Sequence, residues 1–344
     1  MEENLTVRKK AELALGGAVK IPEGFVLPYR ISRSTAGPGA GSSSAVFSFG
    51  GMRVKKTVSR EDGEFELRDE NGKLSMMRGG LPFLDCVSFE PVVYHCPEQA
   101  FFNLDQRCIF NCAFCSSPRL GKDLTKNLTD EKIVDMVRKA VGDGLTVKAV
   151  SLTSGVSGSI ETTVTKMVSC VKAVKSAFPD IPVGVEPYVS DEKDILALYD
   201  AGAEEIKLNL ETPSKEIFSK VCPDMDYDLI FKNLKTCVSV FGKGKVYSNI
   251  IFGMGETDGE LYDVMEKLCS VGVIPVMRAL RTGATNLESL EKVLGHLIPN
   301  DSERALRIAV EQKKIMEKYG LTTIGCKTMC YECRCCDIVP FRDF

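Results

Sequence analysis

The segment Cys108-Ile109-Phe110-Asn111-Cys112-Ala113-Phe114-Cys115 decides how the rest of the chain is interpreted. Its three cysteines are spaced C-x3-C-x2-C, and an aromatic residue directly precedes the last of them. Three thiolates on one tight loop can ligate three irons of a [4Fe-4S] cube, which leaves the fourth iron open to a small molecule. A zinc site or a disulfide loop is the alternative, but zinc prefers four ligands in paired spacings and no histidine lies nearby. The segment therefore predicts an iron–sulfur site with one open coordination position.

Composition and charge limit the classes of protein to consider. The chain has 344 residues, 44% of them hydrophobic and 26% charged, with a net charge of -3 at pH 7. This balance is typical of a soluble globular protein, and no run of apolar residues is long enough for a membrane span. The acidic start lacks the apolar core of a secretory signal, so we expect a cytoplasmic protein. No dense basic stretch argues for a nucleic-acid partner.

Fourteen cysteines are many for a cytoplasmic chain, where metal or cluster ligation is favoured over disulfides. Eight of them fall in two groups, at 108–115 and 326–336. Scattered cysteines are usually small buried hydrophobic residues. We expect that role for most of the other six, which are Cys86, Cys96, Cys170, Cys222, Cys237 and Cys269. Cys96 is the one closest in sequence to the loop.

Residues 1–95 predict an N-terminal extension that is helical at first and then rich in strands. A modest helical pattern covers 1–20, and a Gly/Ser/Pro/Ala stretch at 35–44 predicts a loop. Between Val46 and Arg78 short runs alternate apolar and polar residues, with a turn at Glu70-Asn71-Gly72.

From Phe101 onward, strand patterns alternate with helical ones, which predicts parallel βα units. The first helix is expected after the N-cap Thr129, before Gly142 and Gly144. Its apolar face is expected to comprise Ile133, Val134, Val137, Ala140 and Val141. The predicted strands are 101–106, 147–152, 182–186, 204–210, 246–252 and 273–280. Six units predict an α/β fold, an open partial barrel over 96–320 followed by a tail at 321–344, and a flavodoxin-like sheet is the alternative. Either fold places the cysteine loop at the C-terminal ends of the strands.

The strand Glu205-Ile206-Lys207-Leu208-Asn209-Leu210-Glu211 alternates strictly. The outer face of a barrel packs on helices and must be apolar, so Lys207, Asn209 and Glu211 are predicted to point into the lumen. Glu186, at the end of the preceding strand, could face the same chamber. The alternative is an edge strand with one solvated face.

Two glycine-containing turns follow predicted strands. They are Leu152-Thr153-Ser154-Gly155 and Gly253-Met254-Gly255-Glu256. Glycine after a strand lets the backbone approach a ligand closely. Each turn alone is weak evidence, because helix entry also uses such residues.

Together these features resemble the biotin synthase branch of the radical S-adenosylmethionine (SAM) superfamily. The branch includes lipoyl synthases, the HydE-type hydrogenase maturase and methylornithine synthase. The resemblance covers roughly residues 95–280 and implies a partial (βα)6 TIM-type barrel. It further implies that the open iron chelates the amino and carboxylate groups of SAM, and that one electron cleaves SAM to methionine and a 5′-deoxyadenosyl radical.

The resemblance also assigns roles to individual residues. Cys108, Cys112 and Cys115 would hold the cluster beside Phe114, and the backbone of Thr153, Ser154 and Gly155 would meet the SAM amino group. Asn209 and Glu211, in Asn-Leu-Glu-Thr, would bind the ribose with Glu186 close by. The turn containing Gly253, Gly255 and Glu256 would lie beside the adenine. Arg278 and Arg281, on or just after the sixth strand, are expected to contact substrate or cluster, with solvated arginines as the alternative.

The tail departs from biotin synthase, with Cys326-x3-Cys330-x2-Cys333-x-Cys335-Cys336. Cys326, Cys330, Cys333 and Cys336 could fill a second [4Fe-4S] cluster, with zinc as the alternative. Lipoyl synthases have a second cluster, which is consumed as the sulfur donor, but usually near the N-terminus. This arrangement fits only the two-component lipoate synthases or an uncharacterised relative. We expect the tail to fold back across the mouth of the barrel.

The resulting prediction is a radical SAM enzyme, a transferase of cofactor biosynthesis that ends in sulfur insertion of the biotin or lipoyl synthase type. The alternatives are carbon-skeleton or metallocofactor-maturation chemistry, and a non-catalytic iron–sulfur carrier. Expected partners are a small-molecule or carrier-bound substrate, an electron donor such as ferredoxin or flavodoxin, and a possible partner subunit. No nucleic acid and no membrane are expected.

Overall fold

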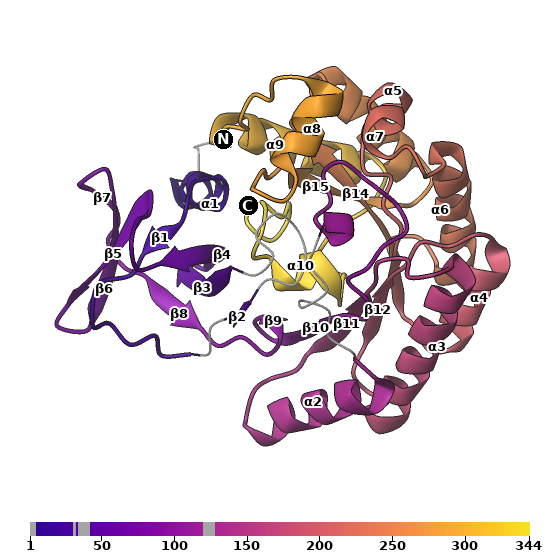
Figure 1. The fold of residues 1–344 in the computed structure, drawn as a ribbon, viewed down its shortest axis with the longest axis horizontal. Helices are drawn as coiled ribbons and strands as arrows, with labels where there is room; N and C mark the ends of the chain where they lie inside the picture. The colour runs from indigo at the N-terminus through magenta and orange to yellow at the C-terminus, as the bar shows by residue number, and fades with distance from the viewer. Residues whose placement is uncertain (1–4, 30–31, 34–41, 120–127) are drawn as a thin grey trace.

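The computed structural model describes residues 5–29, 32–33, 42–119 and 128–344, and its strands form two sheets (Figure 1). The N-terminal sheet contains β1 (Val19–Lys20), β2 (Ser32–Arg33), β3 (Ser43–Phe49), β4 (Met52–Ser59), β5 (Phe65–Glu70), β6 (Lys73–Arg78), β7 (Leu81–Leu84) and β8 (Ser88–Glu90). After the short β9 (His95–Cys96), the second sheet contains β10 (Gln99–Asn103), β11 (Ala149–Thr153), β12 (Val183–Glu186), β13 (Glu205–Lys207), β14 (Val246–Phe252) and β15 (Ile274–Ala279).

The second sheet is the predicted partial barrel. All its strand pairs are parallel, and the spatial order β10-β11-β12-β13-β14-β15 follows the chain. A doubly wound sheet would reverse direction at a switch point, so the flavodoxin-like alternative is wrong. The six strands lie within or next to the predicted ranges, although β13 ends at Lys207 and is shorter than predicted.

Helices cover the outside of the barrel (Figure 1). They are α2 (Asp130–Gly142), α3 (Ile160–Ala177), α4 (Glu192–Asp200), α5 (Lys215–Val221), α6 (Tyr227–Phe241), α7 (Asp258–Ser270), α8 (Leu287–Leu294) and α9 (Ser302–Lys318). The short 3-10 helix η1 (Ser117–Arg119) instead follows the cysteine loop. The predicted N-cap is confirmed, because the Thr129 side chain accepts a hydrogen bond from the Lys132 amide. Val141, expected on the apolar face of α2, is instead 49% exposed.

The N-terminal extension combines α1 (Leu5–Leu15) with the eight-stranded sheet. Asn71 and Gly72 both have positive φ, at 57° and 86°, as a two-residue type I′ hairpin requires between β5 and β6. The predicted turn is therefore confirmed. Most of the predicted loop at 35–44 lies outside the described residues.

The C-terminal tail lies inside the barrel. Its short helix α10 (Met329–Cys333) sits in the middle of the ring of strands (Figure 1). The Met329 amide donates to Gln99 Oε1 at 2.5 Å and to Ser151 Oγ at 3.1 Å. Glu205 accepts from the Thr328 amide and hydroxyl at 2.8 and 2.6 Å. Because Gln99 and Glu205 are the first residues of β10 and β13, α10 occupies the end of the lumen where the strands begin.

The expectation that the tail crosses the mouth of the barrel is therefore wrong for α10, which lies at the other end of the lumen. The physical reason is a set of buried polar partners at the other end of the lumen, which sequence spacing does not reveal. A Cβ on Gly184 would lie 2.1 Å from Thr328 Oγ1, so β12 needs glycine where the tail passes. Further along, buried Lys10 of α1 pairs with Asp343 at 2.6 Å and ties down the end of the tail.

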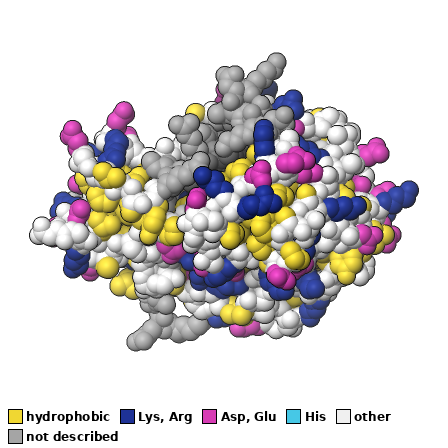
Figure 2. All heavy atoms as spheres, turned by 90° about the horizontal axis from the view of Figure 1, so that it is seen from below, with side chains coloured by type: hydrophobic (Ala, Val, Ile, Leu, Met, Phe, Trp, Pro, Cys, Tyr) yellow, Lys and Arg dark blue, Asp and Glu magenta, His cyan; other side chains and the backbone are white. Residues whose placement is uncertain are grey.

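The face seen in Figure 2 carries Lys and Arg side chains interspersed with Asp and Glu. This distribution agrees with the small net charge of the chain, -3. Among the described residues, the search for a helix both long and apolar enough to span a bilayer finds none.

Candidate active site

The cysteine loop follows β10 and is bonded to the segment that follows β11. The Leu104 amide donates to Thr153 O at 2.8 Å, and the Gly155 amide donates to Asp105 O at 2.7 Å. A Cβ on Gly155 would lie 2.4 Å from the Arg107 carbonyl oxygen, so this close approach requires glycine. The predicted Thr153-Ser154-Gly155 turn therefore supports the cysteine loop directly, and the Ser154 hydroxyl donates to Gly155 O at 2.8 Å.

Hydrogen bonds from three other parts of the chain hold the far side of the loop. Arg119 donates to the carbonyl oxygens of Cys112 and Cys115, at 2.9 and 2.5 Å. The other anchors are Ala113 N to Val221 O at 2.7 Å, Asn111 N to Asp224 Oδ2 at 2.9 Å, Asn286 Nδ2 to Phe114 O at 2.9 Å and Ser289 Oγ to Ala113 O at 2.7 Å. None of these bonds uses a thiol, so the loop is held while its sulfur atoms stay available as ligands.

The three thiols differ in burial. Cys112 is buried, with its sulfur 3.4 Å from Met225 Sδ, whereas Cys108 and Cys115 are partly exposed. Burial raises the pKa of the Cys108 thiol and raises that of Cys115 to about 11. Thiols that bind metal must lose their protons, so ligation would reverse this preference.

Polar side chains from three neighbouring strands meet in the lumen. Glu186 lies 3.0 Å from Lys207 Nζ and accepts from Asn209 Nδ2 at 2.8 Å and Asn249 Nδ2 at 3.4 Å. The prediction that Lys207 and Asn209 point inward is confirmed, and the edge-strand alternative is wrong because β13 lies between β12 and β14. Asn249 was not among the predicted residues, although an amide within the apolar run 246–252 was a signal for it.

Glu211 completes the chamber from an unusual backbone position. Its φ of 65° is left-handed, and it bridges to β14 through hydrogen bonds to Asn249 O at 2.9 Å and from the Ile251 amide at 2.8 Å. Burial, and then repulsion by Glu186, raise the pKa of Glu211 to about 8. The Glu211 charge also acts on the Cys115 thiol. The carboxyl group is therefore held between the chamber and the cysteine loop.

The Gly253–Glu256 turn closes on itself. Gly253 and Gly255 have φ of 103° and 102°, and Glu256 accepts from the amides of Gly253 and Met254 at 2.6 and 2.8 Å. Arg304 also pairs with Glu256 at 2.8 Å. The Glu256 carboxylate and these two amides are thus used within the turn, which leaves the other backbone groups of the turn for a ligand. The adenine contact predicted for this turn stays a prediction.

The tail cysteines lie in three different places. Cys326 is beside Tyr247 and Glu205, whereas the Cys330 sulfur lies 3.4 Å from Lys207 Nζ in the lumen. Cys333 contacts Cys335 and also Cys96 of β9. The predicted set Cys326, Cys330, Cys333 and Cys336 is therefore not brought together. Over the described ranges, no group of three or more His, Cys, Asp or Glu side chains is arranged to hold a metal ion.

Arg278 of the sixth strand, β15, and Arg281 just after it both contact the tail. Arg278 lies 3.2 Å from Asp337 and 3.6 Å from the Cys330 sulfur. Arg281 donates to the Cys336 carbonyl oxygen. Both arginines are therefore bound to protein groups, and a contact with substrate or cluster stays a prediction.

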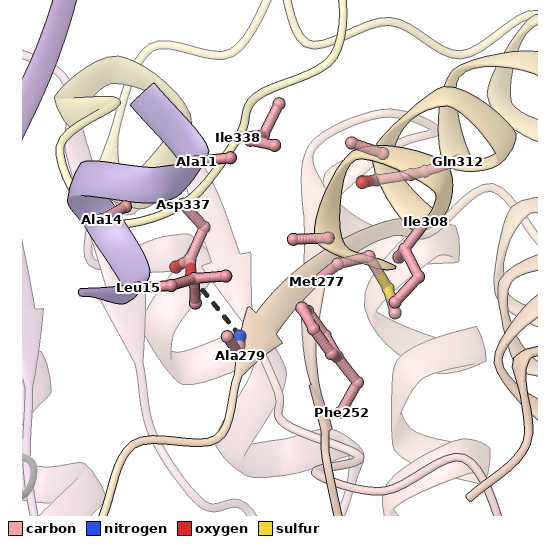
Figure 3. Close-up of a pocket in the computed structure, with 12 residues that line it drawn as sticks. Ala11, Ala14, Leu15, Phe252, Met277, Ala279, Ile308, Gln312, Asp337 and Ile338 are labelled. Carbon is pink, nitrogen blue, oxygen red and sulfur yellow. Dashed lines mark hydrogen bonds between the residues drawn. The ribbon is translucent and has the colours of Figure 1, made fainter. Parts of the chain in front are cut away.

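A small apolar pocket lies outside this site (Figure 3). It is enclosed by α1, α9, the ends of β14 and β15, and the tail, where Asp337 accepts a 3.4 Å hydrogen bond from the Ala279 amide. None of the predicted cofactor-binding residues lines it.

The residues fit the cluster that the sequence predicts. Three thiols lie on one anchored loop, two of them partly exposed, and the electrostatic influence of Cys112 reaches both Cys108 and Cys115. Three protein thiolates suit a [4Fe-4S] cube with one iron left for another ligand. The carboxylates and amides of the chamber next to the loop suit the polar groups of that ligand.

Comparison with known proteins agrees with the predicted resemblance. A biotin synthase from Cutibacterium acnes is 27% identical over 177 residues, which are 49% of this chain and 47% of that protein. A lipoyl synthase from Kocuria rhizophila is 27% identical over 209 residues, 57% of this chain and 58% of that protein. The chain thus spans about half the length of these curated relatives.

Solved structures share the fold. Methylornithine synthase superposes with a TM-score of 0.52 at 17% identity, covering 66% of this chain and 70% of that one. The FeFe-hydrogenase maturase HydG from Carboxydothermus hydrogenoformans has a TM-score of 0.52 at 20% identity, covering 64% and 52%. Residues 103–268 match the model of the radical SAM superfamily. That match includes the cysteine loop and, in full, four of the six barrel strands, β11 to β14, so residues 103–268 form a domain of the radical SAM superfamily.

Proposed function

We propose that this protein cleaves SAM reductively and uses the resulting radical to abstract hydrogen from an unactivated carbon. The observation that carries the proposal is the anchored C-x3-C-x2-C loop at the C-terminal end of the barrel, next to the chamber formed by Glu186, Asn209 and Glu211. Active sites of such barrels lie at this end of the strands.

Cys108, Cys112 and Cys115 would hold a [4Fe-4S] cluster, which, when bound, supplies the electron that cleaves SAM to methionine and a 5′-deoxyadenosyl radical. The protein's own residues contribute by positioning the cysteine loop. Bonds from Arg119 and from Asn286 hold the backbone of the loop in one arrangement.

The chamber would bind the polar groups of SAM. Asn209 and Glu211 offer an amide and a carboxyl group to the ribose hydroxyls, and Glu186 orients Asn209 through their 2.8 Å hydrogen bond. The backbone of Thr153, Ser154 and Gly155 would meet the amino group. The tail fills the opposite end of the lumen and so excludes water from the radical.

The reaction class we propose is sulfur insertion in cofactor biosynthesis, on a small-molecule or carrier-bound substrate. The names of two relatives, biotin synthase and lipoyl synthase, support it. The Cys330 thiol, 3.4 Å from Lys207 Nζ, also supports this proposal as a sulfur-containing group next to the chamber. The electron would come from a ferredoxin or flavodoxin, in the cytoplasm, with a partner subunit as a further possible component.

The test is anaerobic incubation of reconstituted, reduced protein with SAM, followed by measurement of 5′-deoxyadenosine. Formation of 5′-deoxyadenosine in the wild type supports the proposal, and its absence in protein that contains iron would favour a non-catalytic iron–sulfur carrier. Products formed with octanoyl substrates or other cofactor precursors then separate sulfur insertion from carbon-skeleton or metallocofactor-maturation chemistry. A new C–S bond is the expected result, and a product with a rearranged skeleton and no added sulfur would overturn the sulfur-insertion part.

A further inference from the structure

Thiols from distant parts of the chain gather where β9 meets the tail. Cys96, Cys333 and Cys335 pack into one buried cluster with Val46 and Val92, and the Cys335 thiol donates to Cys333 O at 3.1 Å. Cys336 follows Cys335 directly in the chain. Cys96, Cys333 and Cys335 are buried, and Cys336 is partly exposed. Cys237, by contrast, is buried in the separate core cluster of the barrel.

The backbone brings these thiols together without using them. Arg334, directly after α10, has a left-handed φ of 57°, which reverses the chain between Cys333 and Cys335. The reversal is held from the N-terminal extension, where Lys10 Nζ donates to Arg334 O at 2.8 Å. The Lys55 amide donates to Cys335 O, also at 2.8 Å. The group is therefore assembled by α1 and β4 as well as by the tail.

The electrostatic surroundings suit a negatively charged centre. Lys55 Nζ donates at 2.7 Å to the carbonyl oxygen of His95, the residue before Cys96. Arg281 donates to the carbonyl oxygen of Cys336, and Arg278 lies 3.2 Å from Asp337, the residue after it. Four thiolates around a metal carry net negative charge, which is costly to bury without nearby cations. The three basic side chains come from β4, from β15 and from the residues just after it.

We propose that Cys96, Cys333, Cys335 and Cys336 ligate a metal centre of the four-thiolate class. Both a zinc ion and a [4Fe-4S] cluster accept this ligand set. The assignment differs from the prediction made from spacing, because Cys96 joins the set and Cys326 and Cys330 leave it. The sulfur atoms of the described structure are not yet arranged around one point, and the same is true of the cysteine loop. Metal binding would draw either set together as protons leave.

Metal analysis of the full chain tests the assignment. The background is the loop variant Cys108→Ala, Cys112→Ala, Cys115→Ala, so that failure of SAM cleavage does not bear on the result. After anaerobic reconstitution with iron and sulfide, or with zinc, this variant should keep about four irons or about one zinc ion per chain. Adding Cys96→Ser should remove that metal. Adding the matched control Cys326→Ser, a buried tail cysteine outside the group, should leave it.

Two results would overturn the proposal: no metal in the loop variant, or metal kept with Cys96→Ser and lost with Cys326→Ser. Because Cys96→Ser could disturb folding, thiol labelling of the loop variant gives a second measurement. Bound metal should slow alkylation of Cys96 and Cys336 about tenfold or more relative to metal-free protein, while Cys237 labels at the same rate in both. Equal labelling of Cys96 with and without metal contradicts the assignment. The metal recovered identifies the centre as zinc or as an iron–sulfur cluster.

Discussion

The two cysteine groups of this chain look alike in sequence and differ in space. The loop at 108–115 keeps its three thiols on one backbone turn at the C-terminal end of the barrel, anchored by bonds that involve no sulfur. The tail at 326–336 distributes its thiols among the start of β13, the lumen and the junction with β9. Close spacing therefore indicates a shared site only where one local turn holds the whole segment.

The thiols of the tail are separated because hydrogen bonds of the tail backbone and of its polar side chains fix the path of the chain. Thr328 and Met329 are bonded to Glu205, Gln99 and Ser151 at the bottom of the lumen. These buried bonds are costly to leave unmade. They decide where Cys326 and Cys330 lie before any metal is considered.

The sharpest test of the comparison is to remove the loop thiols. The triple variant Cys108→Ala, Cys112→Ala, Cys115→Ala should lose 5′-deoxyadenosine formation down to background, because the open iron needs all three ligands in place. Product is measured by chromatography after anaerobic reduction. The variant should remain folded by circular dichroism, since the anchors of the loop are backbone and side-chain groups other than the thiols. A triple variant that still cleaves SAM would disprove the assignment of the loop.

The second prediction addresses the tail. Gly184→Ala should destabilise the protein by ~1–3 kcal/mol, because its Cβ would lie 2.1 Å from Thr328 Oγ1 and 2.7 Å from Thr328 Cβ. Urea unfolding measures the effect, and limited proteolysis should release the tail more readily. The matched control is Gly142→Ala at the end of α2, where a Cβ meets nothing within 4 Å. Equal stability of the two variants would mean that the tail does not pack against β12.

The third prediction concerns the chamber formed by Glu186, Asn209 and Glu211, between the two cysteine groups. Asn209→Ala and Glu211→Ala should each weaken SAM binding roughly tenfold to a hundredfold, the effect of a lost charge-assisted hydrogen bond of about 1.5–3 kcal/mol. Iron content should not change, because neither residue is a predicted ligand. Calorimetry with reconstituted protein gives the affinity. Glu216→Ala, which removes a carboxylate whose side chain is 80% exposed, serves as the control. Unchanged affinity in both variants would exclude the chamber as the SAM site.

Local patterns were sufficient for the parts of the site that depend on local geometry. The spacing of Cys108, Cys112 and Cys115 and the alternation through Lys207 and Asn209 each describe one turn or one strand, and the structure confirms the inward position of those two polar side chains. The alternation did not predict the backbone position of Glu211. Because β13 ends at Lys207, Glu211 lies outside the strand and has a left-handed φ.

Long-range arrangements could not be predicted in this way. The contact of Cys96 with Cys333 depends on how the tail threads the barrel, and that path depends on polar groups such as Gln99 and Glu205 that look unremarkable in sequence. The turn-closing role of Glu256 likewise depends on its own backbone folding back and on Arg304 from α9.

The last and smallest effect separates two glutamates on the same segment, Glu205 beside the tail and Glu211 beside the loop. Burial raises the pKa of both, that of Glu211 to about 8. A folded-state pKa above the unfolded value of 4.5 means that the folded protein holds the proton longer, so stability falls as pH rises from about 4.5 to 8. In metal-free protein, Glu211→Gln should remove part of this fall.

We expect Glu211→Gln to gain on the order of 1–2 kcal/mol relative to wild type between pH 5 and pH 9, less than the full shift because the side chain is partly exposed. Urea unfolding at both pH values measures the gain. Glu205→Gln is the comparison, and it should be destabilised even at pH 9, because the Thr328 and Lys327 amides lose a carboxylate that accepts from them at 2.8 and 2.9 Å. If the Glu211→Gln difference from wild type does not change with pH, the Glu211 carboxyl group is solvated and not held between chamber and loop.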